Sequence, residues 1–336
     1  MTIWWMLAVV ALASLLLTGA LRRYALSRRL MDIPSARSSH SMPTPRGGGV
    51  AIVISFLVAL PVLSLLDVLP WGQSWALLGA GLCVAVVGFL DDHGHIAARW
   101  RLLTHSTAAI WALFHLGGLP HIELFGFKLQ LGILGAVIAV FYLVWLLNLY
   151  NFMDGIDGIA SVEAISVCLG ATLIYWYLGH IRLSFAPLLL AISVAGFLYW
   201  NFPPARIFMG DAGSGFLGIS LGILSLQAAW AAPQFLWSWL VLLGVFIVDA
   251  TWTLFRRLLR GEKVYEAHRT HAYQFASRRY GRHMPVTLAV FAINLFWLFP
   301  MAFLIGVGRV EGAVGLIVAY IPLFALAVRF KAGERE

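Results

Sequence analysis

Long apolar runs alternate with short polar stretches along the whole 336-residue chain. A helix needs about 20 apolar residues to cross a hydrocarbon core of about 30 Å. Runs of about this length recur eleven times, so the pattern predicts an all-α polytopic membrane protein that forms a single domain over residues 1–336. The expected transmembrane helices are 3–21, 48–66, 73–90, 103–119, 130–148, 159–178, 184–200, 213–230, 235–255, 285–306 and 311–329.

The amino-acid composition also indicates a membrane protein, and the distribution of its charges argues against a nucleic-acid partner. Hydrophobic residues make up 61% of the chain and charged residues 11%, whereas soluble proteins carry about 25% charged residues. The net charge of +8 does not indicate a nucleic-acid partner, because the basic residues follow alternate loops between apolar runs. Cys83 and Cys168 lie inside apolar runs, which favours packing roles over a disulfide or a metal site.

Lysine and arginine are distributed unevenly between the two sides of the predicted bundle. With the N-terminus outside, 20 of the 23 basic residues fall on the cytoplasmic side. This asymmetry follows the positive-inside rule, so we expect an outside N-terminus and a cytoplasmic C-terminus. The cytoplasmic loops that we expect to form the active-site face are 22–47, 91–102, 149–158, 201–212 and 256–284.

The most unusual polar stretch lies between the fifth and sixth apolar runs. It contains four polar residues spaced three apart, Asn148, Asn151, Asp154 and Asp157, which we call the central motif. A charge at the membrane centre costs roughly 2.5–3.5 kcal/mol on insertion scales, so acids at or near this depth favour a functional site. A polar turn between two helices is the structural alternative, although a turn needs only one or two polar residues.

Two further acids, Asp91 and Asp92, follow the third apolar run. The carboxyl end of a helix is partly negative, so each carboxylate there is disfavoured by a few tenths to about 1 kcal/mol. A bound cation would reverse this effect, and carboxylate oxygens suit Mg²⁺. The alternative is an acid pair neutralised by Arg99 or Arg101.

Residues 208–215 combine Asp211 with three glycines just before the eighth run. Asp211 either caps the following helix or, with the glycines, forms an anion site at its N-terminus. Residues 213–218 match the pattern GxGxxG, but no strand precedes them, so we reject a dinucleotide-binding fold. We expect Gly218 and Gly222 to allow close helix packing.

The most basic loop contains a His-Arg-Thr-His sequence at residues 268–271. Zinc-binding histidines usually have further ligands at close spacing, whereas arginines surround this sequence, which favours anion binding. Asp249 lies seven residues before Arg256. At 1.5 Å per helical residue it lies about 10 Å deep, so it needs a partner.

These clusters all fall on the predicted cytoplasmic face and suggest metal-assisted phosphate chemistry. Two like unit charges 4 Å apart repel by about 4 kcal/mol at an effective dielectric of 20, so two phosphorylated reactants need a cation between them. A membrane transporter or flippase of lipid-linked sugars is one alternative, but its polar groups would lie near mid-membrane. A CDP-alcohol phosphotransferase is another, but Asp154-Gly155 does not begin its D-G-x-x-A-R pattern.

Four motifs in order resemble one family. The central motif with its continuation to Ala160, residues 88–92, residues 208–211 and the His-Arg-Thr-His-Ala-Tyr-Gln loop at 268–274 are similar to motifs of the polyprenyl-phosphate N-acetylhexosamine-1-phosphate transferases. This family is glycosyltransferase family 4. The His-Arg-Thr-His variant resembles the bacterial branch that starts O-antigen or other surface-polysaccharide units.

The resemblance implies a reaction at the bacterial inner (cytoplasmic) membrane. N-acetylhexosamine 1-phosphate, or a 6-deoxy relative, would pass from a UDP-sugar to undecaprenyl phosphate, with release of UMP and with Mg²⁺ or Mn²⁺ as cofactor. Because a phosphomonoester has a second pKa near 6, the acceptor is mostly dianionic at neutral pH, which favours direct attack on the β-phosphorus. The sugar (GlcNAc, GalNAc, FucNAc or QuiNAc) and the oligomeric state, a homodimer included, stay open.

The resemblance also implies roles for individual residues. The implied catalytic residues are Asp91, Asp92, Asp154, Asp157, His268 and His271. The implied substrate-binding residues are Arg46, Arg101, Asn148, Asn151, Asn201, Phe208 and Arg269, with Phe208 stacking on uracil. The implied metal ligands are Asp211, as the chief ligand, and Asp92. Two positions depart from relatives: His105 replaces a common Gln, and Met42 replaces a Lys of the peptidoglycan translocases, which argues against a peptidoglycan role.

Overall fold

Helices provide most of the regular structure in the computed structural model, which describes residues 2–34, 39–40, 42–94, 96–262 and 268–334. Parts of the loops 22–47, 91–102 and 256–284 therefore lie outside the described residues. The elements in chain order are α1 (Thr2–Arg28), β1 (Met31–Asp32), β2 (Thr44–Pro45), α2 (Val50–Leu65), α3 (Trp71–His93), α4 (Ala98–Leu116), β3 (Ile122–Leu124), β4 (Phe127–Leu129), α5 (Gly132–Met153), α6 (Ile159–Tyr177), α7 (Ile181–Asn201), α8 (Asp211–Ala231), α9 (Gln234–Leu242), α10 (Gly244–Leu259), α11 (Ala272–Tyr280), α12 (Met284–Ile293), a π-helical turn η1 (Asn294–Leu298), α13 (Phe299–Gly306) and α14 (Gly312–Arg329).

The predicted all-α polytopic class is confirmed. Among the described residues, eight helices are long and apolar enough to cross a membrane, or nine if the pair α9–α10, bent by 71°, is one span. Each expected span coincides with a helix or with consecutive helices, but α2 has only 16 residues and α4 is too polar to qualify. The number eleven and the orientation of the termini stay predictions.

Helix α8 lies inside the bundle, with all of its most apolar window buried. It touches its neighbours backbone to backbone: a Cβ on Gly218 would lie 2.6 Å from the Cα of Leu147 in α5. A Cβ on Gly88 of α3 would lie 2.5 Å from the backbone nitrogen of Ala212. The expectation of close packing at Gly218 is thereby confirmed, and the acids that follow Gly88 lie beside the start of α8.

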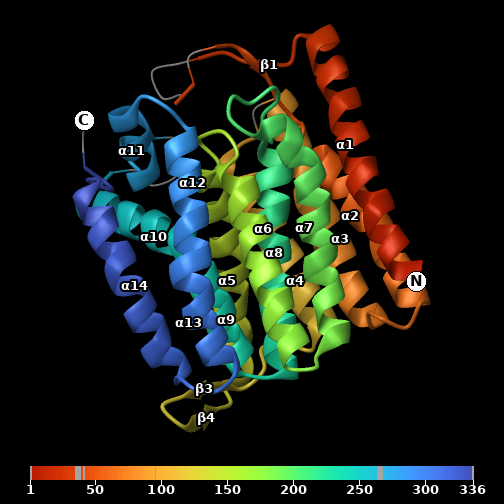
Figure 1. The fold of residues 1–336 in the computed structure, drawn as a ribbon, viewed down its shortest axis with the longest axis vertical. Helices are drawn as coiled ribbons and strands as arrows, with labels where there is room; N and C mark the ends of the chain where they lie inside the picture. The colour runs from red at the N-terminus through yellow and green to blue at the C-terminus, as the bar shows by residue number, and fades with distance from the viewer. Residues whose placement is uncertain (1, 35–38, 41, 95, 263–267, 335–336) are drawn as a thin grey trace.

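The break between α9 and α10 leaves backbone N–H groups free inside the bundle. Glu163 of α6, fully buried, lies close to the Phe246 backbone nitrogen in the first turn of α10. Its Oε2 accepts a 2.6 Å hydrogen bond from Asn294 Nδ2, where η1 begins. Backbone groups at a break inside a membrane need polar partners within the protein, and this carboxyl places one beside the break. Helix α10 then runs obliquely across the bundle (Figure 1).

The two ends of the bundle differ. Strand β1, helix α11 and the C-terminus lie at one end, and the β3–β4 hairpin lies at the opposite end, while α1 and α14 form opposite edges (Figure 1). The antiparallel pairing of β1 with β2 places Met31 opposite Pro45 and Asp32 opposite Thr44. This short pairing keeps the chain at the end of the bundle that carries β1 and α11, just before Arg46.

Candidate active site

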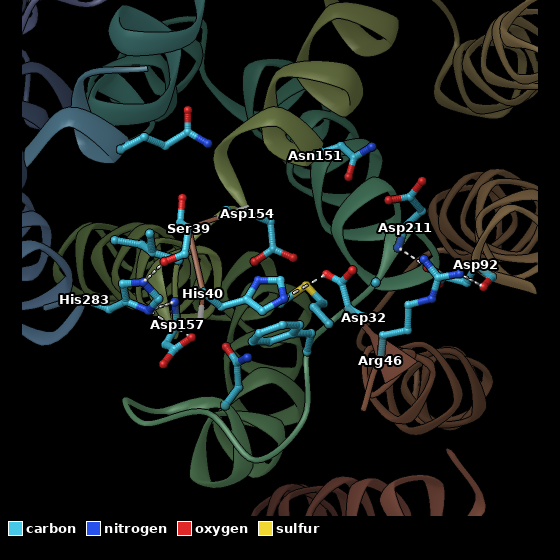
Figure 2. Close-up of a pocket in the computed structure, with 17 residues that line it drawn as sticks. Asp32, Ser39, His40, Arg46, Asp92, Asn151, Asp154, Asp157, Asp211 and His283 are labelled. Atoms are coloured by element: carbon cyan, nitrogen blue, oxygen red, sulfur yellow. Dashed lines mark hydrogen bonds and ion pairs between the residues drawn. The ribbon is translucent and has the colours of Figure 1, made fainter. Parts of the chain in front are cut away.

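A polar cavity of about 280 Å³ opens at the end of the bundle that carries β1 and α11 (Figure 2). Its lining comes from segments far apart in sequence. The lining residues are Asp32, Ser39, His40, Arg46, Asp92, Asn151, Asp154, Gly155, Ile156, Asp157, Asn201, Phe208, Met209, Gly210, Asp211, Gln274 and His283. The structure therefore brings together members of all four predicted motifs, the fourth through Gln274, and Arg46 with them.

The central motif forms the turn between α5 and α6. Asp154 ends α5, and Gly158 adopts a φ of +73°, which turns the chain into α6. Asn201, at the end of α7, holds this turn: its Oδ1 accepts the Gly158 N–H at 3.0 Å. Its Nδ2 donates to the Ile207 carbonyl at 3.0 Å, so Asn201 also orders the segment before Phe208.

Asp154 lies between the Asp157–His283 pair and the Asp92–Asp211 pair in the view of Figure 2. Burial raises the pKa of Asp154 well above its usual range, and the charges of Asp211, Asp92 and Asp157 raise it further. A carboxyl in this setting ionises readily only when a cation or another positive group enters the cavity.

Asp92 caps α8 from a neighbouring helix. Its Oδ1 accepts the Asp211 N–H at 3.2 Å, and its Oδ2 accepts the Ala212 N–H at 3.4 Å. Of the two alternatives for Asp211, the helix cap is wrong, because Gly210 is the N-cap and Asp211 is the first helical residue. The Asp211 side chain is therefore available to the cavity, while Arg46 donates to the Asp92 carbonyl.

A second, largely apolar groove of about 340 Å³ reaches the same point from between α3, α4 and α5. Val84, Phe141 and Trp145 contribute to its walls. Its polar lining residues are Asp91, Arg101, His105, Asn148, Asn151 and Asp211. Among the described residues, the groove and the polar cavity share only Asn151 and Asp211, so a lipophilic and a polar ligand would meet there.

Arg101 neutralises two acids at this junction. Its Nη1 lies 2.6 Å from Asp91 Oδ2 and 3.7 Å from Asp211 Oδ2. The structural alternative for Asp91, an ion pair with Arg101, is thus present. It does not exclude a functional role, because the same guanidinium also faces the groove.

The acids at the junction suit a hard cation whose remaining ligands come from water and substrate phosphates. The Asp91 and Asp211 carboxylates both lie against the Arg101 guanidinium, so two acids share one positive charge at the place where a cation would balance them. Among the residues described, no three acidic, histidine or cysteine side chains are grouped closely enough to hold a metal by themselves. Mg²⁺ needs only one or two carboxylates when water and substrate phosphates complete its shell.

The two histidines of the loop at 268–274, His268 and His271, line neither the polar cavity nor the apolar groove. His271 is 1% exposed and stacks on His268, with 4.8 Å between ring centroids. Burial, followed by the charges of His271 and Arg257, lowers the pKa of His268 to about 3, so this ring is neutral. Neither histidine nor Arg269 lines the cavities, whereas Gln274 lines the polar one.

Asp249 explains this placement. It accepts the backbone N–H groups of Ala272 at 2.9 Å and Tyr273 at 3.0 Å, and lies 3.3 Å from His271 Nδ1. The partner that the buried acid needs is thus the N-terminus of α11. Tyr273 in turn donates through its hydroxyl to the Phe152 carbonyl at 2.9 Å, which places α11 beside the central motif.

Replacing Asp249 by Asn should therefore lower the melting temperature. In Asp249→Asn an amide group would have to accept both backbone N–H groups with one oxygen, and a buried donor left unpaired costs about 1–3 kcal/mol. The check is the thermal unfolding of the purified protein in detergent, with Asp67→Asn in the exposed α2–α3 loop as the matched control. Equal melting temperatures for the two variants would show that Asp249 does not anchor α11.

Several lining residues were not predicted from the sequence. Asp32, Ser39, His40, Gln274 and His283 line the polar cavity. The ring of His40 meets Phe208 edge on, at 4.9 Å between centroids. A signal for His40 was the polar stretch before Arg46, but His283 stands in a basic loop with no local pattern that marks it.

Comparison with known proteins agrees with the motifs. A family model described as glycosyl transferase family 4 matches residues 74–229. The chain is 30% identical over 274 residues to a probable undecaprenyl-phosphate N-acetylglucosaminyl 1-phosphate transferase of Bacillus subtilis, covering 79% of this chain and 74% of that protein. It is 25% identical over 290 residues to an undecaprenyl-phosphate alpha-N-acetylglucosaminyl 1-phosphate transferase of Thermotoga maritima, covering 83% and 84%.

A third relative extends the likeness to another lipid carrier. The chain is 27% identical over 251 residues to a decaprenyl-phosphate N-acetylglucosaminephosphotransferase of Mycolicibacterium smegmatis, covering 68% of this chain and 61% of that protein. Members of four motifs distant in sequence line one polar cavity, and the likeness to the Bacillus protein spans most of the chain. The protein therefore belongs to glycosyl transferase family 4, the polyprenyl-phosphate N-acetylhexosamine-1-phosphate transferases.

Proposed function

We propose that this protein transfers N-acetylhexosamine 1-phosphate, or its 6-deoxy form, from a UDP-sugar to undecaprenyl phosphate and releases UMP. The observation that carries this proposal is the junction at Asn151 and Asp211, where a polar cavity meets an apolar groove. A nucleotide sugar needs the first environment and a polyprenyl chain needs the second. The names of the relatives support undecaprenyl phosphate as the acceptor and an N-acetylhexosamine 1-phosphate as the transferred group.

In this proposal the polar cavity holds the nucleotide and the groove holds the lipid. Phe208 offers a face for the uracil, and the edge of His40 closes the side of that ring. Arg101 lies where the groove meets the acids, so it is placed to bind the lipid phosphate. His268, Arg269 and His271 would then act through α11, whose Gln274 lines the cavity, and not by direct contact with the sugar-diphosphate.

A divalent cation completes the proposal. Asp211, with Asp91 or Asp92 beside it, would hold Mg²⁺ or Mn²⁺, which would offset the repulsion between the two phosphorylated reactants. Both Asp92 oxygens accept backbone N–H groups of α8, and both Asp91 oxygens are engaged by the Ile96 N–H and by Arg101, so either carboxylate would share its oxygens with the cation. Asp154 and Asp157 would position the nucleotide.

The pathway role follows from the residues that distinguish this chain. We infer that it starts O-antigen or surface-polysaccharide units on the cytoplasmic face of the bacterial inner membrane, as the His-Arg-Thr-His variant and the placement of the basic residues suggest. In this role the product is a membrane-bound lipid diphosphate sugar, which further glycosyl transfers would extend.

The decisive experiment is UMP release from a panel of UDP-N-acetyl sugars by membranes that contain the protein, undecaprenyl phosphate and Mg²⁺. We expect release with at least one sugar and its loss on exhaustive chelation, with recovery on adding Mg²⁺ back. Without lipid acceptor, labelled UMP should not exchange into UDP-sugar, because attack on the β-phosphorus is direct. Absence of UMP release with every sugar of the panel would contradict the proposed activity. Turnover after exhaustive chelation would contradict the proposed role of the divalent cation.

A further inference from the structure

His283 connects two segments that are far apart in sequence and that both line the polar cavity. It precedes α12, and its Nδ1 lies 3.1 Å from the Asp157 carboxylate and 3.3 Å from the Asp157 backbone nitrogen. Its Nε2 lies 3.0 Å from the Ser39 carbonyl oxygen. Figure 2 shows the ring between these two partners.

The proton positions follow from the partners. A carbonyl oxygen only accepts, so Nε2 carries a hydrogen and donates it to Ser39. Nδ1 faces both a donor, the Asp157 N–H, and an acceptor, the Asp157 carboxylate. If the ring is neutral, Nδ1 accepts the Asp157 N–H, and its lone pair lies beside the negative carboxylate oxygen. If the ring is protonated, Nδ1 donates a charge-assisted hydrogen bond to that oxygen.

The surroundings favour the protonated ring. Burial opposes the charge, but the hydrogen bond to Asp157 and its negative charge outweigh burial and raise the pKa of His283 above its usual value. The acids Asp32 and Asp154 line the same cavity, as does the basic Arg46. Two further basic groups, His40 and Arg282, line the adjoining cavity together with His283.

Both partners of His283 shape the wall against which a nucleotide would lie. The Asp157 carboxylate also accepts the Ala205 N–H at 3.0 Å, and the Asp157 carbonyl accepts the Thr287 hydroxyl at 2.8 Å. Ser39 is followed by His40, whose ring meets Phe208 edge on. Fixing Ser39 and Asp157 together therefore fixes two sides of the cavity relative to each other.

We propose that His283 is a positioning residue that ties Asp157 of the central motif to Ser39 and so holds the two sides of the nucleotide-binding wall together. It acts through Asp157 and His40 and does not touch the reacting atoms. This inference rests on the proposed function, because it assigns the tie to binding of the UDP-sugar. We expect the UDP-sugar to bind more weakly above the pKa of His283. The charged hydrogen bond between His283 and Asp157 is present below that pKa and is lost as the pH rises through it.

Three variants separate the two halves of the tie. His283→Ala removes both contacts, His283→Asn keeps a donor near the position of Nδ1, and His283→Gln keeps one that reaches toward Ser39. We expect His283→Ala to raise the KM for the UDP-sugar about tenfold, as loss of a charged hydrogen bond does, with kcat within about threefold. His283→Asn and His283→Gln should each recover part of the loss, and His121→Ala, just before β3, should behave as wild type.

Two further measurements test the tie itself. In wild type the KM should rise with pH through the pKa of His283, and in the three variants it should not show this rise. Hydrogen exchange of peptides that contain Ser39 and His40 should be faster in His283→Ala than in wild type. In His283→Gln the exchange rate should return toward that of wild type. The exchange needs no turnover, so it tests the tie even if no UDP-sugar supports UMP release.

The outcomes are distinguishable. Wild-type turnover with an unchanged KM, pH profile and exchange in every variant would overturn the role of His283 while leaving the proposed function intact. Absence of UMP release with any sugar would overturn the proposed function, and the exchange result alone would then decide the tie. If His283→Ala does not fold, the His283→Asn and His283→Gln pair gives the same comparison.

Discussion

Asp211→Asn should reduce turnover by about three orders of magnitude while leaving the protein folded. Asp211 is shared by the polar cavity and the apolar groove, and it faces Arg101 and Asp91. Removing one carboxylate charge about 4 Å from a cation costs about 4 kcal/mol at an effective dielectric of 20, and each 1.36 kcal/mol is tenfold in rate. The loss should therefore appear in kcat of UMP release at saturating UDP-sugar and lipid.

Folding should change little in Asp211→Asn. A carboxylate in the first turn of a helix contributes only about 0.3–1 kcal/mol through the helix dipole, and the amide keeps the size of the side chain. Asp67→Asn, on the exposed α2–α3 loop, is the control with the same chemical change away from the site. A variant at Asp211 that kept a tenth or more of wild-type turnover would show that this carboxylate does not hold the catalytic cation.

Gly88→Ala should have the second-largest effect, through the backbone and without removing a polar group. The added Cβ would lie 2.5 Å from the Ala212 nitrogen and 2.6 Å from the Asp211 carbonyl carbon, and neither backbone atom can turn aside. Helix α3 must therefore move away from α8, which separates Asp91 and Asp92 from Asp211. Displacements of about 1 Å near reacting groups cost about a hundredfold in rate, and overpacking costs about 1–3 kcal/mol of stability.

Two measurements on Gly88→Ala test this reasoning. UMP release should fall about a hundredfold, and the melting temperature in detergent should drop. Gly94→Ala is a matched control near the end of the same helix, because its nearest neighbour atom would lie 3.9 Å from the new Cβ. Unchanged turnover in Gly88→Ala would mean that the close contact of α3 with α8 does not set the distance between the acids.

The sequence alone specified the helices and the main cluster of acids. Each expected apolar run became a helix or consecutive helices, because hydrophobic length is a local property that a membrane helix must satisfy. The central motif was recognisable because four polar residues at the end of an apolar run are more than a turn between two helices needs. Asp92, Asp154, Asp157 and Asp211 do line one cavity.

The tertiary structure decided how individual side chains are used. Asp92 caps α8 across more than a hundred residues, and Asp249 anchors α11 so that His268 and His271 are packed behind Gln274. His283 meets Ser39 although 244 positions separate them. Such hydrogen bonds depend on how helices lie beside one another, and they leave no periodic signal along the chain. Local hydrophobic length thus determined the architecture, and long-range packing determined which polar groups face the cavity.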